Sequence, residues 1–167
     1  MAIDKPLLEI NNLHVGFRIK DDFYDAVDGV SLTLEKNEIL AIVGESALAT
    51  TIMGIHNKLN TKITGDIIYN DVNLVNLNET LYNKIRGNDI GMIFQDPLAS
   101  LNPLMTIGAQ IDEALLYHTD LDEKQRTERV LELLAQVGIP NPQRTFKQYP
   151  HELSGGMRQR VVIAIAL

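Results

Sequence analysis

The feature that most constrains this chain is an apolar run near its carboxyl end that follows a hydroxyl and two glycines. Residues 149–167 read YPHELSGGMRQRVVIAIAL, with Ser154, Gly155 and Gly156 just ahead of the run. Exposed backbone N–H groups at a helix N-terminus, with no Cβ in the way, form an anion site, and a serine adds a hydroxyl donor. The same tripeptide also caps ordinary helices. The pattern therefore predicts a helix that begins with either a plain cap or an anion site.

The block as a whole distinguishes these two interpretations. LSGGM followed by RQRVVIAIAL resembles the signature motif of the ATPases of ABC transporters, which is usually LSGGQ. Methionine in the last position resembles the oligopeptide and dipeptide importer branch of that family. The resemblance implies that Ser154, Gly155 and Gly156 bind the γ-phosphate of an ATP held mainly by a second ABC ATPase subunit, in a homodimer or a heterodimer.

A second motif surrounds Gln95. Residues 90–94 predict a buried strand, and residues 94–108 read FQDPLASLNPLMTIG. An isolated glutamine at a strand end usually serves as a polar cap. This context, however, resembles the Q-loop of the peptide-importer ATPases. The resemblance implies that Gln95 reaches Mg²⁺ and the attacking water, and that it couples the site to membrane subunits.

The phosphate-binding loop expected before the first helix is interrupted. Residues 39–43 predict a buried parallel strand that ends at Gly44, where the pattern G-x-x-x-x-G-K-[ST] should begin. Counting forward places the lysine of this pattern at Thr50, whereas counting back from the following helix places it at Glu45. Roughly five residues are therefore missing between Gly44 and Ala47.

Three explanations of this interruption stay open. The loop is deleted, or a mobile loop is omitted from the sequence, or no phosphate loop exists here. The order of strand, glycine and helix disfavours the third. Gly44, Glu45 and Ser46 remain candidate nucleotide-binding residues, although a carboxylate at Glu45 is unfavourable beside a polyphosphate. Ser46 fits either the first serine of the loop or its Mg²⁺-binding serine.

The amino-terminal part predicts antiparallel strands. Residues 7–19 and 26–34 alternate apolar and polar positions, and residues 65–77 predict a further strand and turn. This region resembles the small antiparallel sheet that opens an ABC ATPase domain, where the family stacks adenine on an aromatic ring. Phe17 is the first choice for that role and Tyr24 is the second.

Two amphipathic helices are predicted between residues 105 and 138, with Asp122 and Gln125 as a capping box for the second. This segment resembles the helical subdomain that docks on the cytoplasmic loops of a transmembrane permease. The histidines show no metal-like spacing, and surface or capping roles are expected for them. They are His14, His56, His118 and His151.

Composition limits the partners and the compartment. The net charge is −7 and no Lys/Arg-rich run appears, which argues against nucleic acid. The absence of cysteine excludes disulfides and thiolate metal sites. The amino terminus shows no signal-peptide pattern, and no apolar run is long enough for a membrane span. The resemblance implies a cytoplasmic protein, peripheral on the inner face of the cell membrane.

The resemblance also implies the fold class: an α/β, P-loop NTPase-like ABC ATPase domain with an N-terminal antiparallel β subdomain and a helical subdomain, truncated after the signature helix. The expected divisions are a nucleotide-binding core with the β subdomain over 1–96, a helical subdomain over 97–152, and the signature motif over 153–167. No apolar run ends in the family's Asp-Glu pair, and the loop lysine is absent. The chain itself is therefore expected not to hydrolyse ATP.

The implied function is that of an ATP-binding subunit of a peptide ABC importer, in which ATP and Mg²⁺ drive uptake. One alternative is a non-catalytic interaction module that presents Ser154, Gly155 and Gly156 to a partner ATPase. Another is a soluble DNA-repair or translation ATPase of the same superfamily. Such relatives usually carry coiled-coil insertions or basic surfaces, and neither occurs in this sequence.

Overall fold

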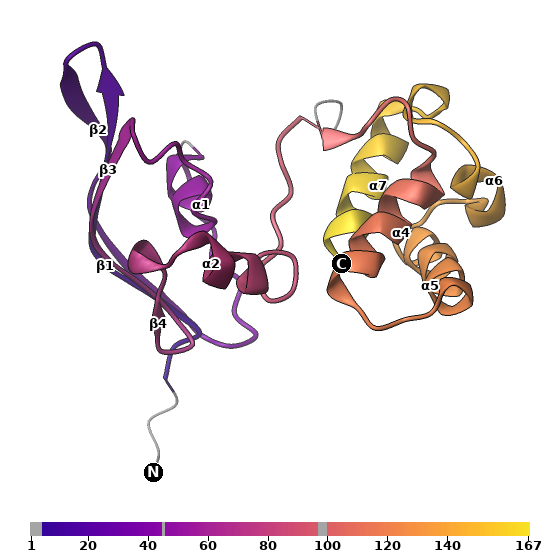
Figure 1. The fold of residues 1–167 in the computed structure, drawn as a ribbon, viewed down its shortest axis with the longest axis horizontal. Coiled ribbons are helices and arrows are strands. Elements are labelled where there is room, and N and C mark those ends of the chain that lie inside the picture. Colours follow the sequence, from indigo (N-terminus) through magenta and orange to yellow (C-terminus); the bar gives the residue numbers. More distant parts are fainter. Residues whose placement is uncertain (1–4, 45, 97–99) are drawn as a thin grey trace. The chain divides into compact units, whose positions relative to one another are not determined.

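The computed structural model describes residues 5–44, 46–96 and 100–167. The chain forms two compact units that divide between Lys84 and Ile85 (Figure 1). The first unit is a sheet covered by short helices, and the second is a cluster of helices. Assignment of a nucleotide-binding core to 1–96 and of a helical subdomain to 97–152 stays a prediction.

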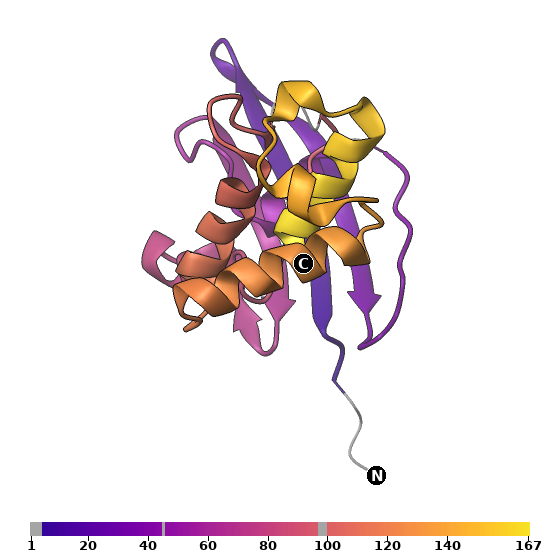
Figure 2. The ribbon, with the colours of Figure 1, turned by 90° about the vertical axis from the view of Figure 1, so that its right-hand side faces the viewer.

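The first unit is built on a four-stranded antiparallel sheet in the order β2-β1-β3-β4. Its strands lie side by side in both views (Figures 1 and 2). The strands predicted over 7–19, 26–34 and 65–77 are confirmed, although the second and third begin earlier than expected. The bounds are β1 Leu8–Ile19, β2 Asp22–Leu34, β3 Thr61–Tyr69 and β4 Val72–Asn73.

One face of this sheet carries the core of the first unit. Leu13, Val15 and Ile67 are fully buried, and Val27 is nearly so. Burying an aliphatic side chain of this size contributes about 1.5–3 kcal/mol, so the alternation of apolar residues decides which face turns inward. The short helices of this unit are α1 Ala47–Ile52, η1 Leu74–Asn76 and α2 Glu79–Ile85.

Replacing Gly65 with alanine is expected to weaken the pairing of β1 and β3. Gly65 has a φ of +91°, and a Cβ there would overlap the carbonyl oxygens of Asn11 and Asn12. A side chain in this conformation costs about 1–3 kcal/mol. Hydrogen exchange should show faster exchange of the amides of β1 and β3. Unchanged exchange would contradict this close approach of the two backbones.

The predictions of a buried parallel strand over 39–43 and of a buried strand over 90–94 are wrong. Neither segment forms a strand, and Ile39 and Val43 are 96% and 100% exposed. A parallel strand is stabilised by paired neighbours and by layers on both faces. Among the described residues, no strand pairs with either segment beyond an isolated parallel bridge between Arg86 and Ile90. The apolar residues of these two segments therefore predicted burial, but the described residues include no neighbouring strand that would bury them.

The second unit consists of helices around one apolar core. Both helices predicted between 105 and 138 are confirmed, and Asp122 and Gln125 form the expected capping box. Ile107, Leu134 and Val161 are fully buried within this core. The elements are α4 Ile107–His118, α5 Glu123–Gln136, α6 Pro142–Phe146, η2 Pro150–Glu152 and α7 Gly155–Ala166.

Within the described part of the chain, no helix combines the length and the apolar character that crossing a membrane would need.

Candidate functional site

The start of α7 carries the motif on which the sequence interpretation depends. Ser154 is the N-cap residue, with an extended backbone (φ −65°, ψ 160°), and its Oγ accepts a hydrogen bond from the Met157 N–H at 3.4 Å. The preceding Leu153 is only 3% exposed and belongs to the apolar core. The buried leucine thus fixes the position of the helix start while the serine remains at the surface.

The two glycines after Ser154 leave the helix start open. Gly155 and Gly156 are exposed, and a Cβ built on either would meet no atom within 4 Å. As the first helical residues, they have N–H groups without an acceptor inside the helix. These donors, together with the positive end of the helix dipole, can bind an anion that approaches from solvent. The helix start therefore has a plain cap and also free donors, and binding of an anion there stays a prediction.

The two arginines of α7 have structural partners. Arg158 donates from Nε to the Leu153 carbonyl at 3.0 Å. Arg160 donates to the carbonyls of Val137 and Gly138, at 2.7 Å and 3.2 Å. These carbonyls lie at the carboxyl end of α5, where cations are favoured. The sequence interpretation missed this contact, although Gly138 after a helix signalled exposed carbonyls nearby.

Replacing Arg160 with methionine is expected to loosen α7 from the end of α5. Both hydrogen bonds to the Val137 and Gly138 carbonyls would be lost, at a cost of about 0.5–1.5 kcal/mol each at most, since the site is exposed. Urea denaturation of the variant should show a correspondingly lower free energy of unfolding. The matched control is Arg129→Met, which removes a half-buried arginine paired with the exposed Glu132 at 3.3 Å and should change stability less.

Gln95 lies at an exposed bend in the second unit, not at the end of a strand. Residues 97–99, which follow it, lie outside the described residues. Ser46 belongs to the first unit and Gln95 to the second. The predicted sharing of one Mg²⁺ by these two side chains therefore stays a prediction.

The remnant of the phosphate loop leads into a short helix. Gly44 has a φ of +152°, and Ser46 precedes α1, with its carbonyl accepting from the Thr50 N–H at 3.0 Å. The Ser46 side chain makes no capping hydrogen bond. Glu45 lies outside the described residues. Residues 44–52 include no lysine or arginine, so this segment has no cation for a phosphate.

The two aromatic candidates for adenine stacking are cross-strand neighbours on β1 and β2. Phe17 pairs with Tyr24 in the strand register. Phe17 is half-buried, and its ring meets His56 edge-on at a centroid distance of 5.0 Å. His56 in turn lies 2.8 Å from the Thr51 hydroxyl. Tyr24 is 57% exposed. Stacking of adenine on Phe17 or Tyr24 stays a prediction.

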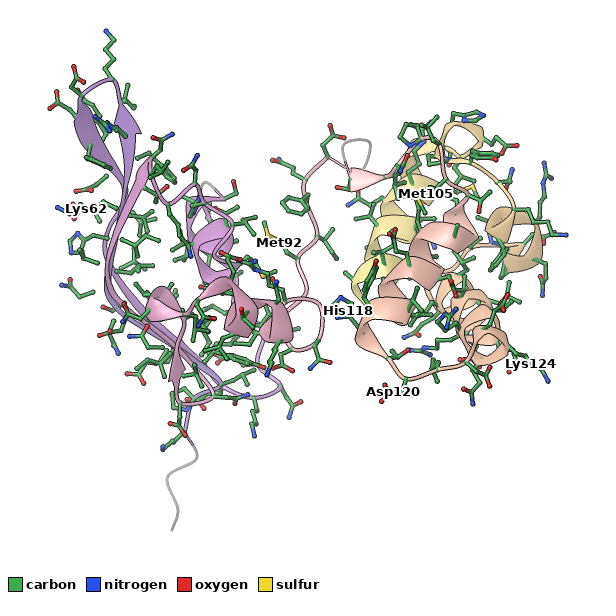
Figure 3. All side chains as sticks on the ribbon, viewed as in Figure 1. Lys62, Met92, Met105, His118, Asp120 and Lys124 are labelled. Carbon is green, nitrogen blue, oxygen red and sulfur yellow. The ribbon has the colours of Figure 1, made fainter. Side chains whose placement is uncertain are left out.

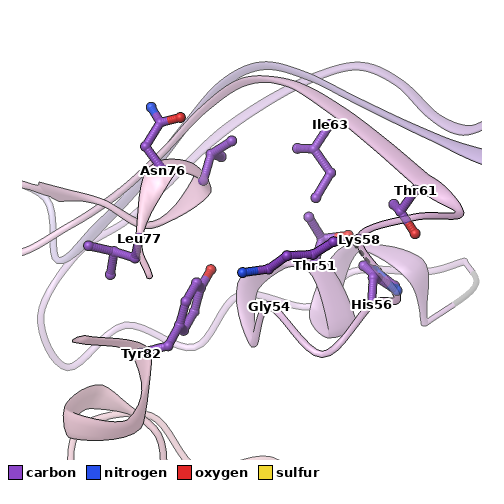
Figure 4. A pocket seen from close by; sticks show the side chains of 10 residues that line it. Thr51, Gly54, His56, Lys58, Thr61, Ile63, Asn76, Leu77 and Tyr82 are labelled. Carbon is purple, nitrogen blue, oxygen red and sulfur yellow. Dashed lines mark hydrogen bonds between the residues drawn. The ribbon is translucent and has the colours of Figure 1, made fainter. Parts of the chain in front are cut away.

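A pocket of about 300 Å³ opens in the first unit (Figure 4). Its lysine pairs with Glu79 at 3.4 Å. None of the predicted site residues lines it, and two of its polar groups, Thr51 and His56, already lie 2.8 Å from each other. The pocket therefore does not replace the start of α7 as the candidate site. Its lining includes Thr51, Gly54, His56, Lys58, Ile63 and Tyr82.

Comparison with known families and proteins agrees with the motif. The family model described as "ABC transporter" matches residues 27–167. The chain is 49% identical to the oligopeptide transport ATP-binding protein OppD of Lactococcus lactis subsp. cremoris over 166 residues, which is 96% of the chain and 49% of that protein. It is 46% identical to the dipeptide transport ATP-binding protein DppD of Bacillus subtilis, over 96% of the chain and 50% of that protein.

The chain thus spans about half the length of the curated relatives it matches. Among solved structures, it resembles the ATP-binding cassette MJ0796 in a dimeric post-hydrolysis state bound to ADP and Pi. The TM-score is 0.80 at 27% identity, over 96% of the chain and 68% of the cassette. A dimeric structure of the same cassette, described as bacterial, gives a TM-score of 0.79 at 26% identity. The expected fold class is confirmed by these neighbours.

Proposed function

The chain belongs to the ABC transporter family, and from that membership we propose that it forms part of the ATP-binding subunit of a peptide importer. The single observation that carries the proposal is the exposed start of α7, where Ser154, Gly155 and Gly156 stand open to solvent. The substrate class is supported by the names of the relatives, which are an oligopeptide transport ATP-binding protein and a dipeptide transport ATP-binding protein. In such a subunit, ATP binding and hydrolysis are coupled to peptide uptake.

The described residues fit the part of an ATP site that contacts the terminal phosphate from a second subunit better than the part formed by the phosphate loop. Ser154, Gly155 and Gly156 supply a hydroxyl and free backbone N–H groups, which suit a terminal phosphate. The segment that holds Gly44 and Ser46 supplies no cation. We therefore propose that this chain contacts, through α7, an ATP whose other phosphates are held by a second ABC ATPase subunit. The dimeric neighbours support such an assembly.

The remaining roles belong to the same proposal. Gln95, and Ser46 if the loop is complete, would hold Mg²⁺, which neutralises charge on the phosphates during phosphoryl transfer. Phe17 would stack on adenine. The helical segment would dock on a transmembrane permease, which places the protein at the cytoplasmic face of the membrane.

The first test is turnover by the chain alone. The sequence has no lysine between residues 44 and 52, and no apolar run in it ends in Asp-Glu. Incubation with Mg·ATP is therefore expected to release no phosphate above the rate in buffer. An intact ABC ATPase subunit assayed in parallel provides the positive control. Phosphate release by the purified chain would overturn the expected inactivity.

The alternative function is a non-catalytic module that supplies only the start of α7 to a partner ATPase, which the absence of a cation from residues 44–52 favours. Titration of ATP with and without a partner subunit separates the two. A nucleotide-binding subunit should bind ATP alone and bind it more tightly with the partner. An interaction module should bind only in the complex.

A further inference from the structure

The outer face of the β1–β2 hairpin gathers an imidazole and two carboxylates. His14, Asp25 and Asp28 each offer one ligand atom, and these atoms all lie within 4.8 Å of one another. His14 Nδ1 already lies 3.0 Å from Asp28 Oδ1. We propose that these three side chains bind a divalent transition-metal cation of the zinc type.

An irregularity in the strand pairing brings the two carboxylates to the same face. Val15 pairs with Val27, whereas the next residue, Gly16, pairs with Asp25, so Ala26 is an extra residue in β2. Without this bulge, strand alternation would place Asp25 and Asp28 on opposite faces. Val27 is 7% exposed and points inward. Both aspartates therefore turn outward on either side of it.

Gly16 leaves room for one ligand atom, and Gly29 lies beside the ring that carries another. A Cβ on Gly16 would lie 2.9 Å from Asp25 Oδ1, so the carboxylate occupies the space that a side chain would fill. A Cβ on Gly29 would lie 3.7 Å from the His14 ring. The imidazole and one carboxylate thus lie directly above backbone that carries no side chain, on a paired hairpin.

The geometry and the donor set suit a zinc-type ion. Donors of a tetrahedral zinc ion lie about 3.4 Å apart when each bond is about 2.1 Å long. The separations here run from 3.0 Å to at most 4.8 Å. Because Asp25 and Asp28 are exposed, their side chains can rotate to close the difference. One nitrogen and two oxygen ligands leave the fourth position for water, and an imidazole favours zinc, nickel or copper over magnesium or calcium.

Lys62 adds a positive charge to this face. Lys62 pairs with Gly16 in the register of β1 and β3, and Figure 3 shows it on the side of the sheet away from α1. Its charge opposes a second cation, so the affinity should rise when it is removed. Lys62→Gln should therefore raise the affinity, whereas loss of a ligand should lower it. Simple adsorption of the ion to scattered carboxylates would not give this pair of effects.

The test is a calorimetric titration of the full 167-residue chain with Zn²⁺, repeated with Co²⁺, whose visible absorption reports its ligands. Saturable 1:1 binding is expected, with a loss of at least about tenfold in affinity for His14→Gln and for Asp25→Asn. His151→Gln and Asp21→Asn make the same chemical changes away from the site and should leave affinity unchanged.

Gly16→Ala keeps all three ligands but should displace the Asp25 carboxylate, and so should also weaken binding. Circular dichroism identifies any variant that fails to fold. A variant that does fail is replaced in the comparison by Asp28→Asn. Absence of saturable binding to the wild-type chain, or equal binding by wild type and folded His14→Gln, would show an ordinary histidine–aspartate pair and overturn the proposal.

Discussion

A glutamate in place of Gly156 is expected to weaken ATP-dependent association of this chain with a partner ABC ATPase subunit by at least about tenfold, without harming the fold. Gly156 is exposed, and a Cβ there meets no atom within 4 Å. An acidic residue in the first turn also favours the helix, through its dipole and through better propensity than glycine. The helix itself should therefore be as stable as before, or more so.

The same carboxylate would face the phosphates that the proposal brings to α7. Two unit charges 4 Å apart repel by about 4 kcal/mol at an effective dielectric constant near 20, which corresponds to roughly 10³ in affinity. Even if the side chain swings aside, a loss of at least about tenfold is expected. Sedimentation velocity with a hydrolysis-deficient partner, with and without Mg·ATP, measures the association.

Gln125→Glu is the matched control, because it adds the same charge to the first turn of α5 and keeps the capping box with Asp122. It should leave association unchanged. Gly156→Ala adds a methyl group without charge and should have a smaller effect. If Gly156→Glu associates as the wild type does, α7 begins with an ordinary cap and the proposed contact with ATP is wrong.

The features that could be predicted from the sequence are those with partners close by in the chain. The Ser154 cap depends on Met157, and the capping box depends on Asp122 and Gln125. The β1–β2 hairpin likewise needs only a short turn. In each case, a few neighbouring residues decide the conformation, and the pattern is readable without knowledge of the rest of the fold.

The features that could not be predicted depend on distant partners or on small irregularities. Residues 39–43 and 90–94 are apolar enough for buried strands, but a strand needs neighbours that local hydrophobicity does not specify. The bulge at Ala26 changes which side chains share a face, and a one-residue shift leaves no clear mark in an alternating pattern. The sequence therefore predicts a surface or capping role for His14, and its part in the proposed metal site is argued from the structure alone.

In the candidate site too, the part formed by one continuous motif could be predicted, and the part formed by distant residues could not. The start of α7 could be predicted because its motif is continuous, and the structure places Ser154, Gly155 and Gly156 together at the surface. Ser46 and Gln95 belong to different units, and neither motif alone specifies a shared Mg²⁺ site, which stays a prediction.

Truncating Leu134 to alanine is expected to give the largest loss of stability in the second unit. Leu134 is fully buried in the core that α4, α5 and α7 share. Removing its isopropyl group leaves a cavity that the surrounding helices cannot close, at a cost of about 2–5 kcal/mol. Because this core also holds Leu153, directly before Ser154, the start of α7 should lose its fixed position as the core loosens.

Hydrogen exchange of the α5 and α7 amides, together with urea denaturation, measures the effect on this unit. Leu104→Ala is the matched control, since the same group is removed from a side chain that is 86% exposed and the change should stay within about 0.5 kcal/mol. Equal losses from the two truncations would mean that Leu134 is not a core residue. A loss confined to Leu134→Ala that also weakens ATP-dependent association would show that the apolar core holds the α7 start in its binding geometry.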